Sequence, residues 1–184
     1  LFVIILFPIL SFSQDFRQLN WGDSSKKLKQ FYPDAIRESS DNTQVYVVND
    51  NILDLEVKTY YTFLNDGLII GKYLFSPTTR IESKEHLKNF NKVSIKLNEK
   101  YSMQRNDKWV DESYMNRPND LYFALQMGDV TIYAEGKSHQ NEYGNINGKI
   151  IHSIEMIKNK LTHTLTYYSQ EGIQYVSEKT KNDF

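Results

Sequence analysis

The fold is decided by the stretch ILDLEVKTYYTFLNDGLIIGKYLF, residues Ile52 to Phe75. Its first part alternates apolar and polar side chains with a period of two, which is typical of an antiparallel strand with one buried face. Asn65-Asp66-Gly67 interrupts this pattern, and a three-residue loop with Gly67 in the left-handed conformation predicts a hairpin. The register that keeps one apolar face pairs Val57 with Phe75, Thr59 with Tyr73, Tyr61 with Gly71 and Phe63 with Ile69.

Further hairpin patterns extend this sheet. Residues 44–48 are predicted to join the stretch above through a turn at 49–52, which completes a first meander of three strands. In a second meander of four strands, residues 121–127 turn at Gly128-Asp129 into 130–134, and residues 149–158 turn at Asn159-Lys160 into 161–168. The predicted register of the last hairpin places Met156 opposite His163, Ile154 opposite Leu165 and His152 opposite Tyr167.

Two segments have the 3.6-residue period of amphipathic helices. The first begins at Asp23 or Ser24, carries Leu28 on its apolar side and ends before Pro33. The second begins at Ser83 and repeats apolar residues every three or four positions as far as residue 101. Together these patterns predict an α+β fold: an antiparallel sheet of about seven strands, with both helices packed on its apolar face.

The chain has 184 residues and is predicted to form one domain, residues 14–169, whose halves, 14–76 and 77–169, each contain a helix followed by a meander. Residues 170–184 read as a polar tail. Residues 1–13 form an apolar run that ends in Ser11-Phe12-Ser13, a small-x-small pattern typical of signal-peptide cleavage. A membrane anchor is the alternative, but a span needs about 20 apolar residues and Pro8 interrupts this run. We therefore expect a secreted chain that begins at Gln14, in the periplasm or outside the cell.

Composition excludes several classes of function. The 22 Lys and Arg residues balance 23 Asp and Glu residues, so no strong field attracts nucleic acid or an anionic bilayer. The chain has no cysteine, which removes disulfides, thiolate nucleophiles and thiolate metal sites. The sequence motifs of serine hydrolases, dinucleotide-binding proteins and P-loop proteins are absent as well. We expect no cofactor.

The start of the domain carries an F-x-x-x-x-W-G-x-S pattern, formed by Phe16, Trp21, Gly22 and Ser24 and followed by a lysine-rich helix and a meander. This order resembles a group of small exported bacterial α+β proteins of unassigned function, and the resemblance covers most of the chain after residue 13. A fainter likeness, in element order alone, is to the small lipoprotein of the outer-membrane barrel-assembly machine and to proteinaceous β-lactamase inhibitors, both of which are binding modules. The lack of cysteine departs from the lipoprotein pattern. The resemblance supplies no catalytic residue.

The histidines are the first candidates for a metal site or a general base. In the predicted register His152 and His163 share a sheet face but lie four positions apart along the ladder, roughly 13 Å at about 3.3 Å per residue, which is too far for one zinc ion. His86 and His139 fall in a helix and a loop, and no H-x-x-x-H spacing occurs. The sequence therefore predicts no metal site and no catalytic residue.

The polar segment 102–120 shows no period and holds the densest mixture of charged and aromatic residues. We expect four of its side chains to contact a partner: Arg105, Trp109, Tyr114 and Arg117. The alternative is that Trp109 packs beneath the segment.

Three hypotheses of function follow from these patterns. The first is a non-catalytic exported module that binds a protein or an envelope component through a sheet edge or the segment 102–120. The second is a secreted hydrolase that uses carboxylates among Asp107, Asp111, Glu112 and Glu155. The third is a small-ligand cup between the sheet and the helices.

Overall fold

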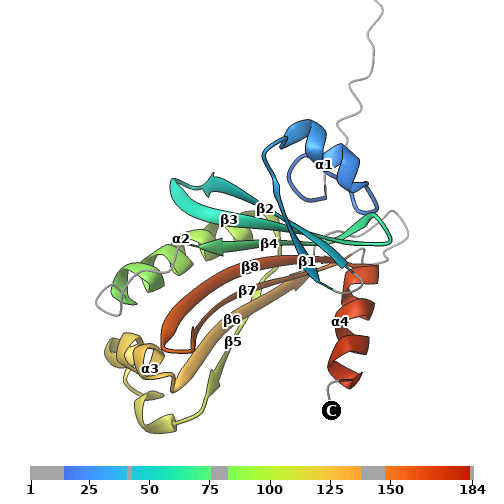
Figure 1. Cartoon of the computed structure of the whole chain (residues 1–184). Coiled ribbons are helices and arrows are strands. Elements are labelled where there is room, and N and C mark those ends of the chain that lie inside the picture. Colours follow the sequence, from blue (N-terminus) through green and yellow to red (C-terminus); the bar gives the residue numbers. More distant parts are fainter. Residues whose placement is uncertain (1–14, 41–42, 76–82, 138–147, 183–184) are drawn as a thin grey trace, which may run out of the picture.

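The structure is a computed structural model that describes residues 15–40, 43–75, 83–137 and 148–182. It is α+β, and its centre is an antiparallel sheet of eight strands in the order β1-β2-β3-β4-β8-β7-β6-β5 (Figure 1). The strands are β1 (Ile36–Ser40), β2 (Thr43–Ile52), β3 (Leu55–Leu64), β4 (Gly67–Phe75), β5 (Gln104–Trp109), β6 (Val130–Lys137), β7 (Gly148–Ile157) and β8 (Lys160–Ser169). The helices are α1 (Ser25–Phe31), α2 (Ser83–Lys100), α3 (Leu121–Met127) and α4 (Gln170–Asn182), with short 3₁₀ helices η2 (Glu112–Tyr114) and η3 (Pro118–Asp120).

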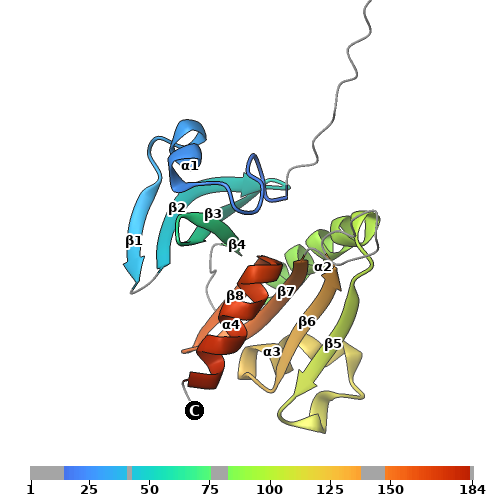
Figure 2. The ribbon, with the colours of Figure 1, turned by 90° about the vertical axis from the view of Figure 1, so that its right-hand side faces the viewer.

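Two meanders meet in the middle of this sheet. β1 to β4 follow α1, β5 to β8 follow α2, and the last strands of the two meanders, β4 and β8, pair antiparallel. Both helices pack on one face, which we call the inner face, because Leu28 of α1 and Val93 and Leu97 of α2 share a buried cluster with Tyr61 and Leu165 of the strands. α4 lies on the opposite face of the sheet from α2 and α3 (Figures 1 and 2).

The segment before α1 covers the junction of the two meanders. The Phe16 side chain is 2% exposed, and its ring centroid lies 5.0 Å from that of Tyr73 on β4 and 5.5 Å from that of Tyr167 on β8. Gly71 lies beneath the Phe16 ring, and a Cβ atom at this position would collide with the ring carbons. The absence of a side chain at residue 71 therefore allows Phe16 to seat on the junction.

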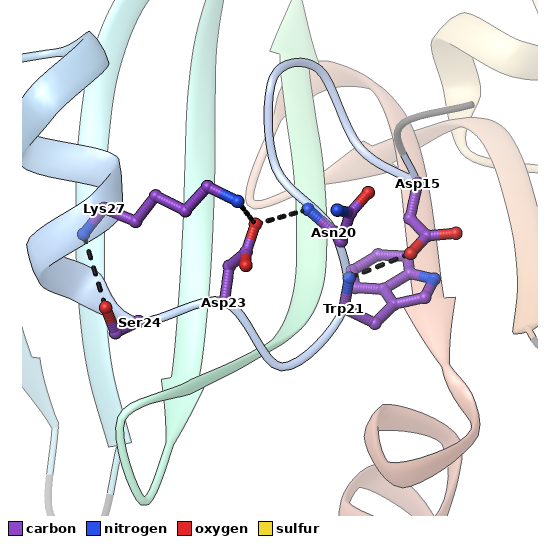
Figure 3. Close-up of polar contacts among 6 residues, drawn as sticks. All are labelled: Asp15, Asn20, Trp21, Asp23, Ser24 and Lys27. Carbon is purple, nitrogen blue, oxygen red and sulfur yellow. Dashed lines mark hydrogen bonds and ion pairs between the residues drawn. The ribbon is translucent and has the colours of Figure 1, made fainter. Parts of the chain in front are cut away.

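The W-G-x-S motif ties this segment to the β3–β4 hairpin. The Gly22 N–H donates to the Leu68 carbonyl and the Leu68 N–H donates to the Asp23 carbonyl, both at 2.9 Å. Gly22 has φ +82°, in the left-handed region that glycine adopts without strain. The Trp21 N–H donates to Asp15 Oδ2 at 2.9 Å (Figure 3). The motif is thus held by backbone bonds at the turn into α1.

The same motif starts α1. The Asp23 carboxylate accepts hydrogen bonds from the Asn20 N–H and from Lys27 Nζ, both at 2.7 Å (Figure 3). Ser24 is the N-cap, and its hydroxyl accepts a bond from the Lys27 N–H as expected for a residue before the first turn. Ser25 donates to the Asp66 carboxylate at the tip of the β3–β4 hairpin. These contacts give the motif a structural role.

The fold class predicted from the sequence is confirmed, but the numbers of strands and helices are wrong. β1 was not predicted, and β5 lies in the segment 102–120 that showed no period. The segment 170–182, read as a polar tail, forms α4. The predicted signal segment, residues 1–13, lies outside the described residues.

Residues 121–127 form helix α3 and not the predicted strand. Their alternating pattern is also compatible with a helix, because Leu121, Ala124 and Leu125 lie on one helical face and pack into a second buried cluster. Leu, Ala, Gln and Met are strong helix formers. Gly128, with φ +83°, ends the helix as a left-handed C-cap and not as part of a hairpin turn.

The β3–β4 register is largely as predicted. Val57 pairs with Phe75, Thr59 with Tyr73 and Tyr61 with Gly71, but Phe63 pairs with Leu68 because the register shifts after Thr62. The turn residues with positive φ are Asn65 and Asp66, at 50° and 64°, and not Gly67. At this shift, the neighbouring residues Leu68 and Ile69 are both buried, although residues next to each other in a strand normally face opposite sides.

The other two predicted turns are displaced. β2 and β3 turn at Leu53-Asp54, with φ of 50° and 65°, so Ile52 pairs with Leu55. β7 and β8 turn at Lys158-Asn159, with φ of 48° and 61°. Positive φ at both central residues is the type I′ requirement, which non-glycine residues meet here. Each displaced turn therefore gives its two strands a pairing register that differs from the predicted one.

Among the helices of the described ranges, none combines the length and the apolar character needed to cross a membrane.

The contact between Phe16 and Gly71 leads to a stability prediction. Gly71→Ala should lower the free energy of unfolding by about 1–3 kcal/mol, because the added methyl group forces the Phe16 ring off the junction. Gly67→Ala is the matched control, since the nearest atom to its new Cβ would be the Leu64 carbonyl oxygen at 3.5 Å. Urea denaturation of both variants measures the difference, and equal stabilities would contradict the proposed seating of Phe16.

Candidate functional site

A buried polar chain links α2 to the inner face of the sheet. Ser94 Oγ of α2 lies 3.1 Å from His152 Nδ1 of β7, and His152 Nε2 lies 2.7 Å from His163 Nε2 of β8. Both imidazoles are fully buried. They stack on phenylalanine rings, His152 on Phe90 with centroids 4.0 Å apart and His163 on Phe75 at 3.8 Å.

This arrangement corrects the predicted separation of the two histidines. The β7–β8 register places His163 opposite Ile154 and His152 opposite Leu165, two residues away from the predicted pairing. A shift of two residues keeps every side chain on its face, so alternation does not detect it. The two rings become diagonal neighbours and form a hydrogen bond.

The geometry of the pair is that of a hydrogen bond between imidazoles. Two nitrogens that are each about 2 Å from one tetrahedral metal lie about 3.3 Å apart, and the observed separation is shorter, 2.7 Å. Within the described residues, His, Asp and Glu side chains do not gather in groups of three or more that could hold a metal ion.

Burial keeps both imidazoles neutral. Loss of hydration lowers the pKa of His152 to about 3. For His163, burial is the main cause and the neighbouring His152 and His86 add to it, so that its pKa falls to about 2. At pH 7 the pair therefore shares hydrogen bonds without carrying charge.

The unpaired nitrogen of His163 indicates the direction of the chain. Its buried Nδ1 has no hydrogen-bond partner. An orphaned buried N–H is rarer in proteins than an orphaned acceptor, so the favoured tautomer leaves this nitrogen unprotonated. His163 Nε2–H then donates to His152 Nε2, and His152 Nδ1–H donates to Ser94 Oγ. In this tautomer Ser94 accepts a hydrogen bond from His152.

A cavity of about 320 Å³ lies next to this chain, between α2 and the inner face near the sheet edge. Its floor is one cross-strand row, in which Arg105 of β5 pairs with Ala134 of β6 and Ala134 pairs with His152 of β7. We call it the α2–β5 cavity, and its other lining residues are Phe90, Asn91, Ser94, Ile95, Leu97, Asn98 and Met103. The small Ala134 side chain leaves space between the larger residues of the row.

Arg105, which was predicted from the sequence as a binding residue, lines this cavity. Its guanidinium binds the Asp107 carboxylate through Nε and Nη2, both at 2.9 Å. These bonds use two of the five N–H groups of the guanidinium, so both N–H groups of Nη1 and the second N–H of Nη2 point away from Asp107 and can donate to an acceptor. Most of the lining is apolar, with amide, hydroxyl and imidazole groups among it.

The structure does not bring the other predicted binding residues to this cavity. Trp109 and Tyr114 are partly buried and pack against the second cluster, which contains Phe90 and Leu125. The alternative reading of Trp109, packing beneath its segment, therefore describes its position. Arg117 is exposed beyond η2, and its N–H donates to the Tyr114 carbonyl.

The four candidate carboxylates do not share one face. Asp107 pairs with Ile132 and projects to the inner face, whereas Glu155 projects to the outer face together with Lys72. Burial lowers the pKa of Lys72, and the nearby Glu155 opposes part of this shift. Asp111 caps η2 by accepting bonds from Ser113, which lowers the pKa of its carboxyl, and Glu112 is exposed. This separation gives no support to a paired-carboxylate mechanism.

Sequence reasoning did not identify Ser94, Ala134 and His152 as parts of one site. The signal was present in part, since Ser94 interrupts the apolar face of the second helix. The contact of Ser94 with His152 depends on where α2 lies on the sheet, and the contact of His152 with His163 depends on the β7–β8 register.

Comparisons of the chain with family models, curated proteins and solved structures found no match. The class of protein is therefore defined by its fold, α+β with one eight-stranded antiparallel sheet. The resemblance to small exported proteins stays a prediction.

The buried histidines make stability depend on pH. In the unfolded chain both have a pKa near 6.5, whereas the folded values are about 3 and about 2, so the unfolded state binds more protons as the pH falls below 6.5. Between pH 7 and pH 5 the free energy of unfolding should fall by about 2 kcal/mol per histidine. It should stay nearly constant above pH 7.

Urea denaturation at several pH values measures this dependence. A double variant, His152→Leu with His163→Leu, is the comparison, because replacing both partners leaves no unpaired imidazole. Its stability should change much less between pH 7 and pH 5. Equal slopes for the two proteins would show that these histidines do not control the pH dependence.

Proposed function

We propose that this chain is an exported, non-catalytic binding module that takes an apolar side chain of a partner protein into the α2–β5 cavity. The observation that carries the proposal is the cavity itself, about 320 Å³, placed beside a strand at the end of the sheet order. Its volume is at the lower end of ligand sites, which run from roughly 300 to 1,000 Å³. A cavity of this size suits one anchoring side chain better than a large cofactor.

The position of β5 supports a polypeptide partner. Among the described strands, β5 pairs with β6 alone, so one side of its backbone is not used by another of these strands. An extended peptide can add to such an edge through backbone hydrogen bonds, and its alternate side chains then enter pockets on one face. Arg105 lies on β5 and lines the cavity, so a strand bound there passes the cavity mouth.

The chemistry of the lining fits an apolar side chain carried by a polypeptide backbone. Phe90, Leu97 and Met103 offer an apolar surface, and Asn98 and Arg105 offer hydrogen bonds for a backbone or side-chain carbonyl. Residues 1–13, with their apolar run and Ser11-Phe12-Ser13, support export. A partner in the cell envelope or outside the cell follows from that location.

One observation favours a second function, a serine hydrolase. Ser94 Oγ and His152 Nδ1 are within hydrogen-bond distance, at 3.1 Å. Against this, the low pKa of His152, about 3, makes it a weak base at neutral pH. The direction of the chain also makes Ser94 an acceptor. A fluorophosphonate probe that labelled Ser94 at neutral pH would favour the hydrolase and overturn the binding proposal.

A cavity-filling substitution tests the binding proposal. Random peptides displayed on phage are selected on the wild-type protein, and the affinities of the enriched peptides are measured by fluorescence anisotropy. Ala134→Leu should weaken their binding by at least about tenfold, or about 1.4 kcal/mol, because leucine occupies the space of the anchor. Its melting temperature should not fall, since added apolar bulk fills a void.

Thr131→Leu is the matched control, because residue 131 lies on the same strand but on the outer face. It should bind the peptides as the wild type does. Arg105→Ala, at a side chain that is 45% exposed, serves as a second variant that should fold and bind more weakly. Failure to enrich any peptide, or equal binding by Ala134→Leu and the wild type, would contradict the proposal.

A further inference from the structure

A second hollow lies on the other side of α2, between this helix and η3 and α3. It has a volume of about 550 Å³ and is open to solvent along its length. We call it the lysine groove, because three of its nine lining residues are lysines. The lining is Lys84, Leu87, Lys88, Asn91, Lys92 and Ile95 from α2, Asn119 from η3, and Leu121 and Tyr122 from α3.

The lysines belong to a stripe that runs the length of α2. Lysine recurs at every fourth position, and on a helix this spacing places successive side chains about 6 Å apart on neighbouring turns. The stripe consists of Lys84, Lys88, Lys92, Lys96 and Lys100. Lys84 to Lys92 line the groove, whereas Lys96 and Lys100 lie beyond it. The chain has a net charge of −1, so this concentration of positive charge is local.

No carboxylate is among the described residues that line the groove. Glu85 lies 3.7 Å from Lys88, and Asp54 lies 3.9 Å from Lys92, and both carboxylates are more than half exposed. Exposed pairs of this kind contribute only about 0–1 kcal/mol, so an incoming anion can replace them. Lys92 also donates to the Leu53 carbonyl at 2.7 Å, which holds it more firmly than the other two.

We propose that the lysine groove binds an acidic, extended peptide segment of a partner protein. In an extended chain, alternate side chains point to the same side about 6.6–6.8 Å apart, which matches the spacing of the lysines. Carboxylates at alternate positions would then meet Lys84 and Lys88. The side chains between them would face the apolar residues of the groove, Leu87 and Leu121.

Two features favour a peptide over other anionic partners. The groove is a hollow between α2 and the η3–α3 segment, and an extended chain can reach further into it than a bilayer surface can. The Tyr122 ring is covered by Lys84 Nζ at 4.7 Å from its centroid, so it is not an open platform on which a nucleic-acid base could stack. The site does not depend on the α2–β5 cavity, although Asn91 and Ile95 line both hollows.

Paired charge variants test the proposal. The probe is a fluorescein-labelled peptide of about ten residues, long enough to span the groove, in which Glu alternates with Leu or Ser. Anisotropy should show binding to the wild-type protein that weakens as salt is raised. Lys84→Gln with Lys88→Gln should weaken it by about two- to fivefold per lysine, or about tenfold in total.

The control removes the same charge from the same helix. Lys96→Gln with Lys100→Gln lies outside the groove and should change the affinity by less than about twofold. Ala134→Leu should leave it unchanged, which separates this site from the cavity. Equal loss in the two lysine variants would show a net-charge effect and overturn the proposal. The proposal would also be overturned if the protein did not bind the peptide. A protein that bound phosphatidylglycerol vesicles with the same lysine dependence, and not the peptide, would indicate a membrane surface as the partner.

Discussion

The structure depends on the pairing of β4 with β8. Each meander has four strands and one apolar face, and the pairing makes them a single sheet whose inner face is broad enough to carry both α1 and α2. The junction contains Gly71 opposite Tyr167 and Tyr73 opposite Leu165, and Phe16 covers it from the inner side. Side-chain packing across the two strands adds to their backbone hydrogen bonds, since the rings of Tyr73 and Tyr167 meet edge to face at 6.2 Å. The N-terminal segment is thus part of the sheet's core.

The candidate sites follow from this junction through β8. Because β8 pairs with β4 on one side and with β7 on the other, it places His163 against His152 and under α2. α2 then lies between two hollows, one shared with β5 and β6 and one shared with η3 and α3. Asn91 and Ile95 line both, so the exposed ridge of α2 is the wall between them. Changes in the position of α2 alter both hollows together.

The sequence was sufficient where side-chain alternation and helical period are unambiguous. The hairpin of Val57 and Phe75, a helix start at Asp23 or Ser24 and the amphipathic α2 were predicted for that reason. It was insufficient where a pattern has two solutions. Leu121, Phe123, Leu125 and Met127 alternate as a strand does, but residues 121, 124 and 125 also form one face of a helix, and tertiary packing selects the helix.

The histidine pair shows the same limit at the level of the site. Lys158-Asn159 and Asn159-Lys160 are both plausible turns, and the two registers differ by two residues while every side chain keeps its face. The distance between His152 and His163 changes from about 13 Å along the ladder to direct contact with this choice alone. Arg105 was predicted as a binding residue from its neighbours in sequence, but the cavity it lines depends on Ala134 and α2, which are distant in the chain.

The buried histidines connect stability to the proposed binding surfaces. Apolar residues of the same volume could fill the space under α2, but they would not fix the helix by a directed bond. The bond between Ser94 and His152 is one fixed point for the rotation of α2, in addition to the buried Phe90, Val93 and Leu97 on the same helix. Stacking of Phe90 on His152 holds the same turn of the helix against the sheet. A neutral polar chain in the core therefore helps to position the helix that forms a wall of both hollows.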